Sequence, residues 1–180
     1  MMATPIQTPS AGDKAKLIVQ HLRRAGIDLV ATLPDAWLSS LLDAIDADPA
    51  MTMVRVTRED EGVGICAGAF LGGRKAALVA QNAGLLLSAN ALAGLAMHHQ
   101  VPLILVLAQR GGPDDDQYYQ VYKGRVTAPV ARAIGLPCHV ISSVDDYHLI
   151  EDGARQAYLA RSPVVLLLNR AALLGDDARF

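Results

Sequence analysis

Three consecutive acidic side chains, Glu59, Asp60 and Glu61, stand between an apolar run and a long segment of small and apolar residues. Carboxylates in such a place can take and return protons during catalysis, or they can stabilise the first turn of a helix. Residues 62–67 also match G-x-G-x-x-A, a pattern found where a helix start binds the phosphates of a dinucleotide.

A dinucleotide site needs its first glycine in the tight turn directly after a strand, so that the phosphates meet the helix N-terminus. Here residues 57–61 separate Val56, the expected strand end, from Gly62. Acidic side chains in that interval would also repel a phosphate. We therefore expect the glycines to lie inside a helix, where a missing side chain allows close packing, and we take the acidic group as the functional candidate.

The elements that position this group follow from an alternation of helical and strand-like patterns. Such alternation predicts an α/β fold in three layers, with helices on both faces of a six-stranded parallel sheet. We expect a single domain over 11–175, tails at 1–10 and 176–180, and an irregular stretch over 108–126. The expected strands are 29–33, 52–56, 76–80, 103–107, 139–141 and 164–168, and the expected helices are 13–24, 36–47, 60–71, 83–97, 129–134 and 145–160.

Ligands of an open parallel sheet bind beyond the carboxyl ends of its strands. Asp35 and Asn82 at this edge could each cap the helix that follows, whereas Gln81 has no capping position. Arg110 could be a solvated loop charge or a partner for an anion. The residues expected at this edge are Pro34, Asp35, Arg58, Glu59, Gln81, Asn82, Gln109 and Arg110.

Residues 57–111, TREDEGVGICAGAFLGGRKAALVAQNAGLLLSANALAGLAMHHQVPLILVLAQRG, resemble the pyrimidine-binding domain of thiamine diphosphate enzymes. The chain is most similar to the alpha subunit of sulfopyruvate decarboxylases and to the corresponding part of phosphonopyruvate decarboxylases. The motifs LPDAWL, QNAGL and RG occur at positions where those families have similar motifs. The resemblance extends from about residue 13 to residue 168 and implies the thiamine diphosphate-binding fold.

The resemblance implies that Glu59 is the catalytic glutamate, because that residue lies nine positions before the glycine of the family's A-G pair, here Gly68. In such enzymes the glutamate contacts N1′ of the cofactor's aminopyrimidine and favours the imino form that takes the C2 proton. The activated cofactor then attacks a 2-oxo acid and accepts the electrons left when carbon dioxide departs. Without the resemblance, a helix cap would be the better interpretation of Glu59.

The resemblance also implies roles for the other residues at the edge. Asp35 aligns with an aspartate that handles protons in related decarboxylases, so it is a second catalytic candidate. Pro34, Gln81 and Asn82 are expected to bind or orient the cofactor.

The substrate is expected to be a small anionic 2-oxo acid, bound by Arg110, with Lys123 and Arg125 as weaker candidates. Similar decarboxylases carry a histidine in the loop after the fourth strand, whereas the loop here, GGPDDDQYYQVYKGR, has none. Either Tyr118 or Tyr119 donates the proton instead, or the substrate differs. The length of the loop is typical of a lid.

Half of a thiamine enzyme is missing from these residues. In the family, the domain that binds the diphosphate carries a G-D-G motif with a paired asparagine downstream. Neither a G-D-G motif nor an Asn-Asn pair occurs here. The resemblance therefore implies an alpha subunit that holds thiamine diphosphate together with a beta subunit, which supplies the Mg²⁺ site, in a hetero-oligomer. Two alternatives stay open: a non-catalytic or regulatory binding module, and a subunit of a carboligating thiamine enzyme.

The composition argues against other classes of function. A formal net charge of -2 gives no general attraction to nucleic acid or to an anionic membrane. Cys66 and Cys138 match no disulfide framework or metal spacing, and with no signal-peptide pattern they indicate a reduced, cytoplasmic setting. His98 and His99 precede the fourth strand, so we expect them at the edge of the sheet away from the site.

Overall fold

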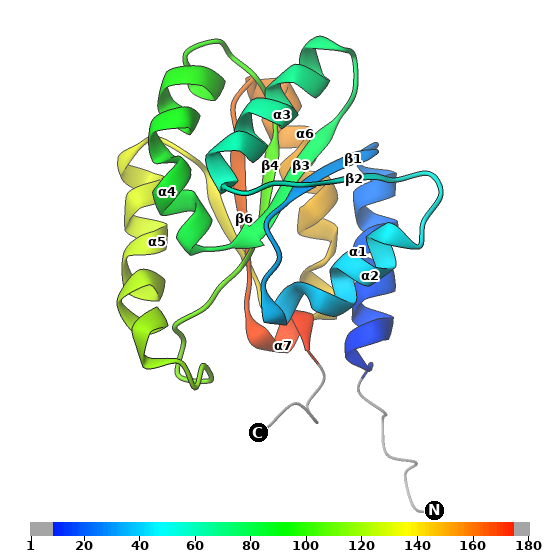
Figure 1. Cartoon of the computed structure of the whole chain (residues 1–180), viewed down its shortest axis with the longest axis vertical. Coiled ribbons are helices and arrows are strands. Elements are labelled where there is room, and N and C mark those ends of the chain that lie inside the picture. Colours follow the sequence, from blue (N-terminus) through cyan, green and yellow to red (C-terminus); the bar gives the residue numbers. More distant parts are fainter. Residues whose placement is uncertain (1–8, 175–180) are drawn as a thin grey trace, which may run out of the picture.

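The computed structural model describes residues 9–174, which form one sheet of six parallel strands (Figure 1). The strand order is β2-β1-β3-β4-β6-β5. β2 lies on one side of β1, whereas the strands from β3 onward lie on the other side, so the order in which strands are added reverses between β1 and β3. In such sheets, ligands bind beyond the strand ends at the point of reversal. The strands are β1 (Leu29–Thr32), β2 (Thr52–Arg55), β3 (Ala76–Gln81), β4 (Ile104–Ala108), β5 (Cys138–Ile141) and β6 (Val164–Leu168).

Helices cover both faces of the sheet, which confirms the expected α/β architecture. The first, second and sixth helices pack on one face, and the third, fourth and fifth pack on the other (Figure 1). The helices are α1 (Ala11–Arg24), α2 (Ser39–Asp46), α3 (Glu59–Leu71), α4 (Ala83–Ala91), α5 (Val121–Ala133), α6 (His148–Ala160) and α7 (Arg170–Leu173), with short 3-10 or π turns η1 (Ala36–Leu38), η2 (Leu92–Met97), η3 (Tyr118–Gln120) and η4 (Val144–Asp146).

Two hydrophobic cores form because successive strand residues point to opposite faces of the sheet. Leu78 and Leu105 belong to the core under α3, α4 and α5, whereas Val79 and Val106 belong to the core under α1, α2 and α6. β3, β4 and β6 are buried along nearly their whole length, which explains why they read as continuous apolar runs.

The fifth helix corrects one sequence-based expectation. It begins at Val121, inside the stretch expected to be irregular, and Pro129 lies within it rather than at its start. A proline inside a helix removes one backbone hydrogen bond, so it is usually a sign of a helix boundary. Here the first turns are held by tertiary contacts, in which Thr127 bonds Asn82 and Gly124 packs against Arg110.

The remaining expected elements are present with small shifts at their ends, while α7 and the change from α-helix to the π turn of η2 were not predicted. Of the tail expected at 1–10, the structure describes only Pro9 and Ser10, and the tail expected at 176–180 lies outside the described residues. Among residues 9–174, no helix is long and apolar enough to cross a membrane.

Candidate active site

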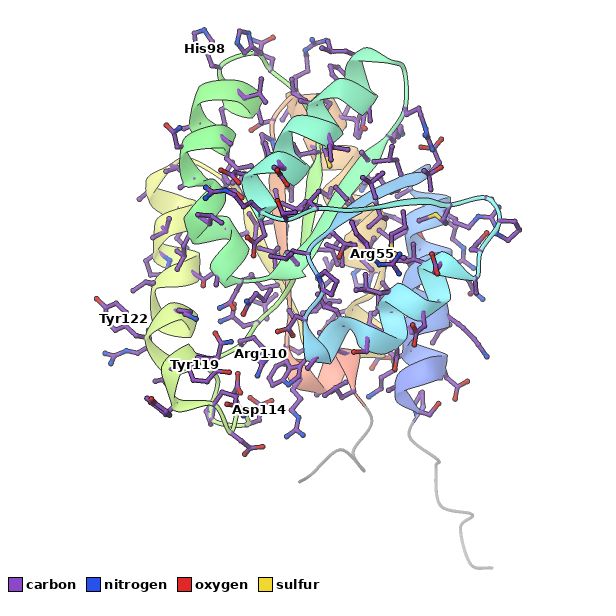
Figure 2. The ribbon with its side chains drawn as sticks, in the orientation of Figure 1. Arg55, His98, Arg110, Asp114, Tyr119 and Tyr122 are labelled. Atoms are coloured by element: carbon purple, nitrogen blue, oxygen red, sulfur yellow. The ribbon has the colours of Figure 1, made fainter. Side chains whose placement is uncertain are left out.

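The residues that follow β1, β2, β3 and β4 meet at the carboxyl edge of the sheet, since all strands run in the same direction. Figure 2 shows Arg110, Asp114 and Tyr119 at this edge, far from His98 at the opposite end of the molecule. The expectation that His98 lies away from the candidate site is therefore confirmed.

Glu59 is the first residue of α3, and its environment differs from that of its two acidic neighbours. It is only 5% exposed, and no other described residue gives its carboxylate a hydrogen bond or an ion pair. Asp60 pairs instead with Arg58 at 2.9 Å, and Glu61 accepts the backbone N–H of Thr57 at 2.9 Å as a helix cap. The two neighbours thus stabilise the helix start, which leaves Glu59 available to a ligand.

Two glycines allow Glu59 to lie where it does. A Cβ added to Gly84, in the first turn of α4, would come within 2.6 Å of Cγ and 3.0 Å of Oε1 of Glu59. A Cβ added to Gly62 would come within 2.5 Å of Cδ1 of Leu78, so this glycine lets α3 pack closely on β3. The glycines of the G-x-G-x-x-A match therefore lie inside a helix, as expected, and the match does not form a phosphate turn.

Arg110 lies between two carboxylates. Its Nη1 donates to both oxygens of Asp35, at 2.9 and 3.2 Å, while its Nε and Nη2 donate to Asp115 at 2.8 and 3.0 Å. The guanidinium carbon also lies 4.4 Å from the ring centroid of Trp37. All three charged side chains are nearly buried. The structure thus brings Asp35 and Arg110 together, and adds Asp115 and Trp37 to them.

The charges of this group shift one another's proton affinity. Burial raises the pKa of Asp115, but the hydrogen bonds from Arg110, Gly111 and Gln117 outweigh burial and hold that pKa below its usual value. Burial lowers the pKa of Arg110, but Asp115 and Asp35 outweigh it, and the pKa is raised. Both groups are therefore charged at neutral pH. Asp35 additionally accepts the backbone N–H of Trp37 at 3.0 Å, so capping, one of the two roles that the sequence left open for it, is present in the structure.

Asn82 is fully buried and its side chain does not cap α4. Its Nδ2 donates to the carbonyl of Arg110 at 3.2 Å and to Oγ1 of Thr127 at 3.0 Å. Its Oδ1 accepts the backbone N–H of Arg110 at 3.4 Å. Asn82 therefore fixes the backbone of Arg110 to α4 and α5.

Gln81, at the end of β3, accepts a hydrogen bond at 3.0 Å from Nε2 of Gln120. The Oε1 atom of Gln120 is buried without a partner among the described residues, as are Oε1 of Gln109 and Oγ1 of Thr32. Native proteins leave few buried polar atoms unpaired. Three such atoms on residues at or near strand ends of this edge fit a site that holds a polar ligand.

The loop after β4 is closed tightly at its base. A Cβ on Gly111 would lie 2.2 Å from the carbonyl oxygen of Gln120, and a Cβ on Gly124 would lie 2.5 Å from that of Arg110. Gly111 also has a φ of +82°, which favours glycine. The backbone segments that enter and leave the loop can approach this closely only because both residues are glycine.

The other predicted residues are placed less centrally. Tyr118 is 86% exposed, and Tyr119 is more than half exposed with Nζ of Lys123 5.3 Å from its ring centroid. Neither hydroxyl has a hydrogen bond to another predicted site residue within the described part of the chain, and Pro34 is exposed. The structure therefore does not gather the two tyrosines with Asp35 and Arg110.

A cavity of about 280 Å³ opens beside Arg110. Its walls include Trp37, Arg170, whose Nη1 donates to the carbonyl of Asp114 at 3.1 Å, and the acidic loop residues. The sequence analysis did not find Trp37, Asp115 or Arg170. The run of three aspartates was visible, but nothing in it distinguished the buried Asp115 from its neighbours.

Comparison with known proteins places the chain among thiamine enzymes. Residues 13–124 match the family described as thiamine pyrophosphate enzyme, N-terminal TPP binding domain. The sulfopyruvate decarboxylase subunit alpha of Methanococcus maripaludis is 34% identical over 156 residues, which cover 86% of this chain and 93% of that protein. The phosphonopyruvate decarboxylase of Streptomyces viridochromogenes is 30% identical over 72% of this chain and 33% of its own length.

A solved structure agrees on the fold. The 2-oxoglutarate:ferredoxin oxidoreductase of Magnetococcus marinus superimposes with a TM-score of 0.70 over 92% of this chain and 30% of that chain, at 18% identity. At this identity the likeness concerns the fold alone.

Proposed function

The chain belongs to the family of thiamine pyrophosphate enzyme N-terminal TPP binding domains, and we propose that it is the alpha subunit of a two-component, thiamine diphosphate-dependent 2-oxo acid decarboxylase. The relatives named above act on sulfopyruvate or phosphonopyruvate, so the proposed substrate is a small 2-oxo acid with a second anionic group. The observation that carries the catalytic part is Glu59, a buried carboxylate that has no partner among the described residues.

Glu59 would exchange a proton with N1′ of the aminopyrimidine. When bound, the cofactor supplies the carbanion and the electron sink for decarboxylation. The residues present fit its aminopyrimidine, because Glu59 is available and unpaired acceptors lie on Gln109, Gln120 and Thr32 at or near the same edge. A carboxyl group in this position can act in both directions, as proton donor and acceptor.

Asp35 and Arg110 would serve the substrate. Arg110 offers a planar fork that matches a carboxylate, sulfonate or phosphonate. Asp35, hydrogen-bonded to Nη1 of Arg110, is the candidate for proton transfer to the product. Gln81 remains a candidate contact to the cofactor, whereas Asn82 would act by holding Arg110 in place. Tyr118 and Tyr119 could reach the substrate only if the loop moved, because both are largely exposed.

A beta subunit would supply the diphosphate and Mg²⁺ site. The relative from Methanococcus maripaludis is named as a subunit, and these 180 residues contain no G-D-G word. Among residues 9–174, no group of three or more histidine, cysteine, aspartate or glutamate side chains could hold a metal. The outer surfaces of α3 and α4 support a partner, since no charged residue lies at 62–71 or 76–97 and Leu71 and Leu87 are exposed.

A reconstitution experiment tests this proposal. The chain alone is expected to bind thiamine diphosphate weakly and to release no carbon dioxide from sulfopyruvate, phosphonopyruvate or pyruvate. Addition of a chain that carries the G-D-G motif should yield a hetero-oligomer with an even number of chains and produce activity. Full activity of the isolated chain would refute the two-component proposal.

The free thiols of Cys66 and Cys138 support a reducing compartment, and we propose that the protein is located in the cytoplasm.

A further inference from the structure

The acidic loop GGPDDDQ contains three successive aspartates, and only the middle one is turned inward. The side chain of Asp115 is 2% exposed, whereas Asp114 and Asp116 are exposed residues. Asp115 accepts hydrogen bonds from Nε and Nη2 of Arg110 and from the backbone N–H groups of Gly111 and Gln117. No described residue donates a hydrogen bond to the side-chain carboxylate of Asp114 or of Asp116.

Asp115 occupies the preferred anion-binding edge of Arg110. Two parallel bonds from Nε and Nη2, at 2.8 and 3.0 Å, are the arrangement in which a guanidinium binds a carboxylate and, equally, a sulfonate or phosphonate. The opposite corner, Nη1, is taken by Asp35. An anionic ligand that uses the fork of Arg110 must therefore replace the carboxylate of Asp115.

The loop is built so that Asp115 can leave. Its base is held without Asp115, because Asn82 bonds the N–H and the carbonyl of Arg110, and Nε2 of Gln109 donates to the carbonyl of Gly124. Asp115 adds one bond at the base, from the N–H of Gly111. Besides the bonds to Asp115, described residues outside the tip at 112–117 donate to two of its carbonyls, Arg170 to Asp114 and the N–H of Gln120 to Gln117. Displacement of the Asp115 side chain would thus break the contact with Arg110 while the base stays in place.

The net charge of the adjoining cavity repels an anion until Asp115 has moved. Two guanidinium groups, of Arg110 and Arg170, line it together with three carboxylates, so the lining carries a net charge of -1. Without Asp115, two positive and two negative groups remain and the lining is neutral. A cavity of about 280 Å³ has room for a small organic anion.

We propose that Asp115 is an internal competitor of the substrate, which occupies the anion site of Arg110 until the second anionic group of a dianionic 2-oxo acid displaces it. A monoanionic acid such as pyruvate has no second anion to exchange, so it leaves the contact between Arg110 and Asp115 closed. This inference rests on the proposed function. Asp115 thereby sets how tightly a second anionic group is bound, beyond the anion binding expected of Arg110 itself.

A fluorescence titration of the full chain tests the inference without catalysis. Trp37 is the single tryptophan, and its ring lies against the guanidinium group of Arg110, so its fluorescence should respond when the partner of that group changes. The ligand is sulfoacetate, a dianion that carries no oxo group. Asp115→Asn should lower its Kd by about tenfold relative to the wild-type chain, since the competing charge is gone. The matched controls Asp114→Asn and Asp116→Asn remove the same charge from the lining but leave Nε and Nη2 of Arg110 occupied, so they should lower the Kd less, and Arg110→Ala should abolish binding.

A Kd for Asp115→Asn equal to or above that of Asp114→Asn, or no response of Trp37 in any variant, would overturn the inference. Should the asparagine variant fail to fold, Asp115→Ser keeps an acceptor for Gly111 and carries the same expectation. In the reconstituted enzyme, Asp115→Asn should lower KM for sulfopyruvate and leave KM for pyruvate unchanged. Absence of decarboxylation in every variant would count against the proposed function, while the titration would still decide the role of Asp115.

Discussion

At the scale of single residues, the position of Glu59 depends on what its neighbours lack. The absence of a side chain at Gly84 leaves room for Cγ and Oε1 of Glu59, at distances where a methyl group could not fit. Gly84 is part of the QNAGL motif, so that motif both leaves space for the side chain of Glu59 and contains candidate contacts to the cofactor. The sequence alone suggested cofactor contacts for this motif but gave no reason for its glycine.

Gly84→Ala should therefore displace the Glu59 carboxylate and lower the rate of cofactor activation. We expect a loss of about a hundredfold in turnover, since an error of about 1 Å in a catalytic group is sufficient for a loss of that size. The measurement is turnover of the reconstituted decarboxylase, beside thermal unfolding of the isolated chain. Gly12→Ala, an exposed helical glycine with no atom closer than 3.9 Å to the added Cβ, is the control. Equal turnover in both variants would exclude a positioning role for Gly84.

At the scale of elements, the ion pair between Arg110 and Asp115 holds the loop between β4 and α5. Hydrogen bonds depress the pKa of Asp115 below its usual value of 3.8, so its stabilising effect is present above that pH. The effect is lost as the pH falls through the pKa of the folded state. Loop anchoring should therefore fail in acid and not in alkali.

The melting temperature of the wild-type chain should exceed that of Asp115→Asn at neutral pH, and the difference should begin to shrink as the pH falls below about pH 4. We expect a few degrees, since about 1 kcal/mol shifts the Tm of a chain of this size by roughly 2–4 °C. Thermal unfolding followed by circular dichroism from pH 3 to pH 8 measures both curves. A difference of the same size at pH 3 and at pH 8 would show that the carboxylate charge is not its cause.

Most elements could be predicted because their physical cause is local. The apolar runs of β3, β4 and β6 and the alternation of helices led directly to a parallel sheet. The start of α5 was missed because Pro129 reads as a boundary, whereas tertiary contacts of Thr127 and Gly124 hold the turns before it. The pairing of Arg110 with Asp115 was missed because burial distinguishes identical aspartates only after the loop has folded.

At the scale of the whole molecule, the candidate interface with the beta subunit is the outer surface of α4 and of residues 62–71 of α3, which contain no charged residue. Leu87→Arg should weaken that association by about tenfold or more, since a charge would be buried against the partner without a counter-ion. Leu159→Arg, at an exposed leucine of α6 on the other face of the sheet, is the matched control. Sedimentation of mixtures with the G-D-G chain gives both affinities. Equal affinity of the two variants would place the interface elsewhere.

The exchange rate of the C2 proton of bound thiamine diphosphate measures whether Glu59 activates the cofactor. Glu59→Gln keeps the shape of the side chain but cannot share a proton with the aminopyrimidine. In the reconstituted enzyme, the rate of C2 exchange should fall by about 10²–10⁴-fold, the range of general acid–base catalysis, while the fold and the cofactor affinity are largely kept. An exchange rate in Glu59→Gln close to that of the wild-type enzyme would contradict the account.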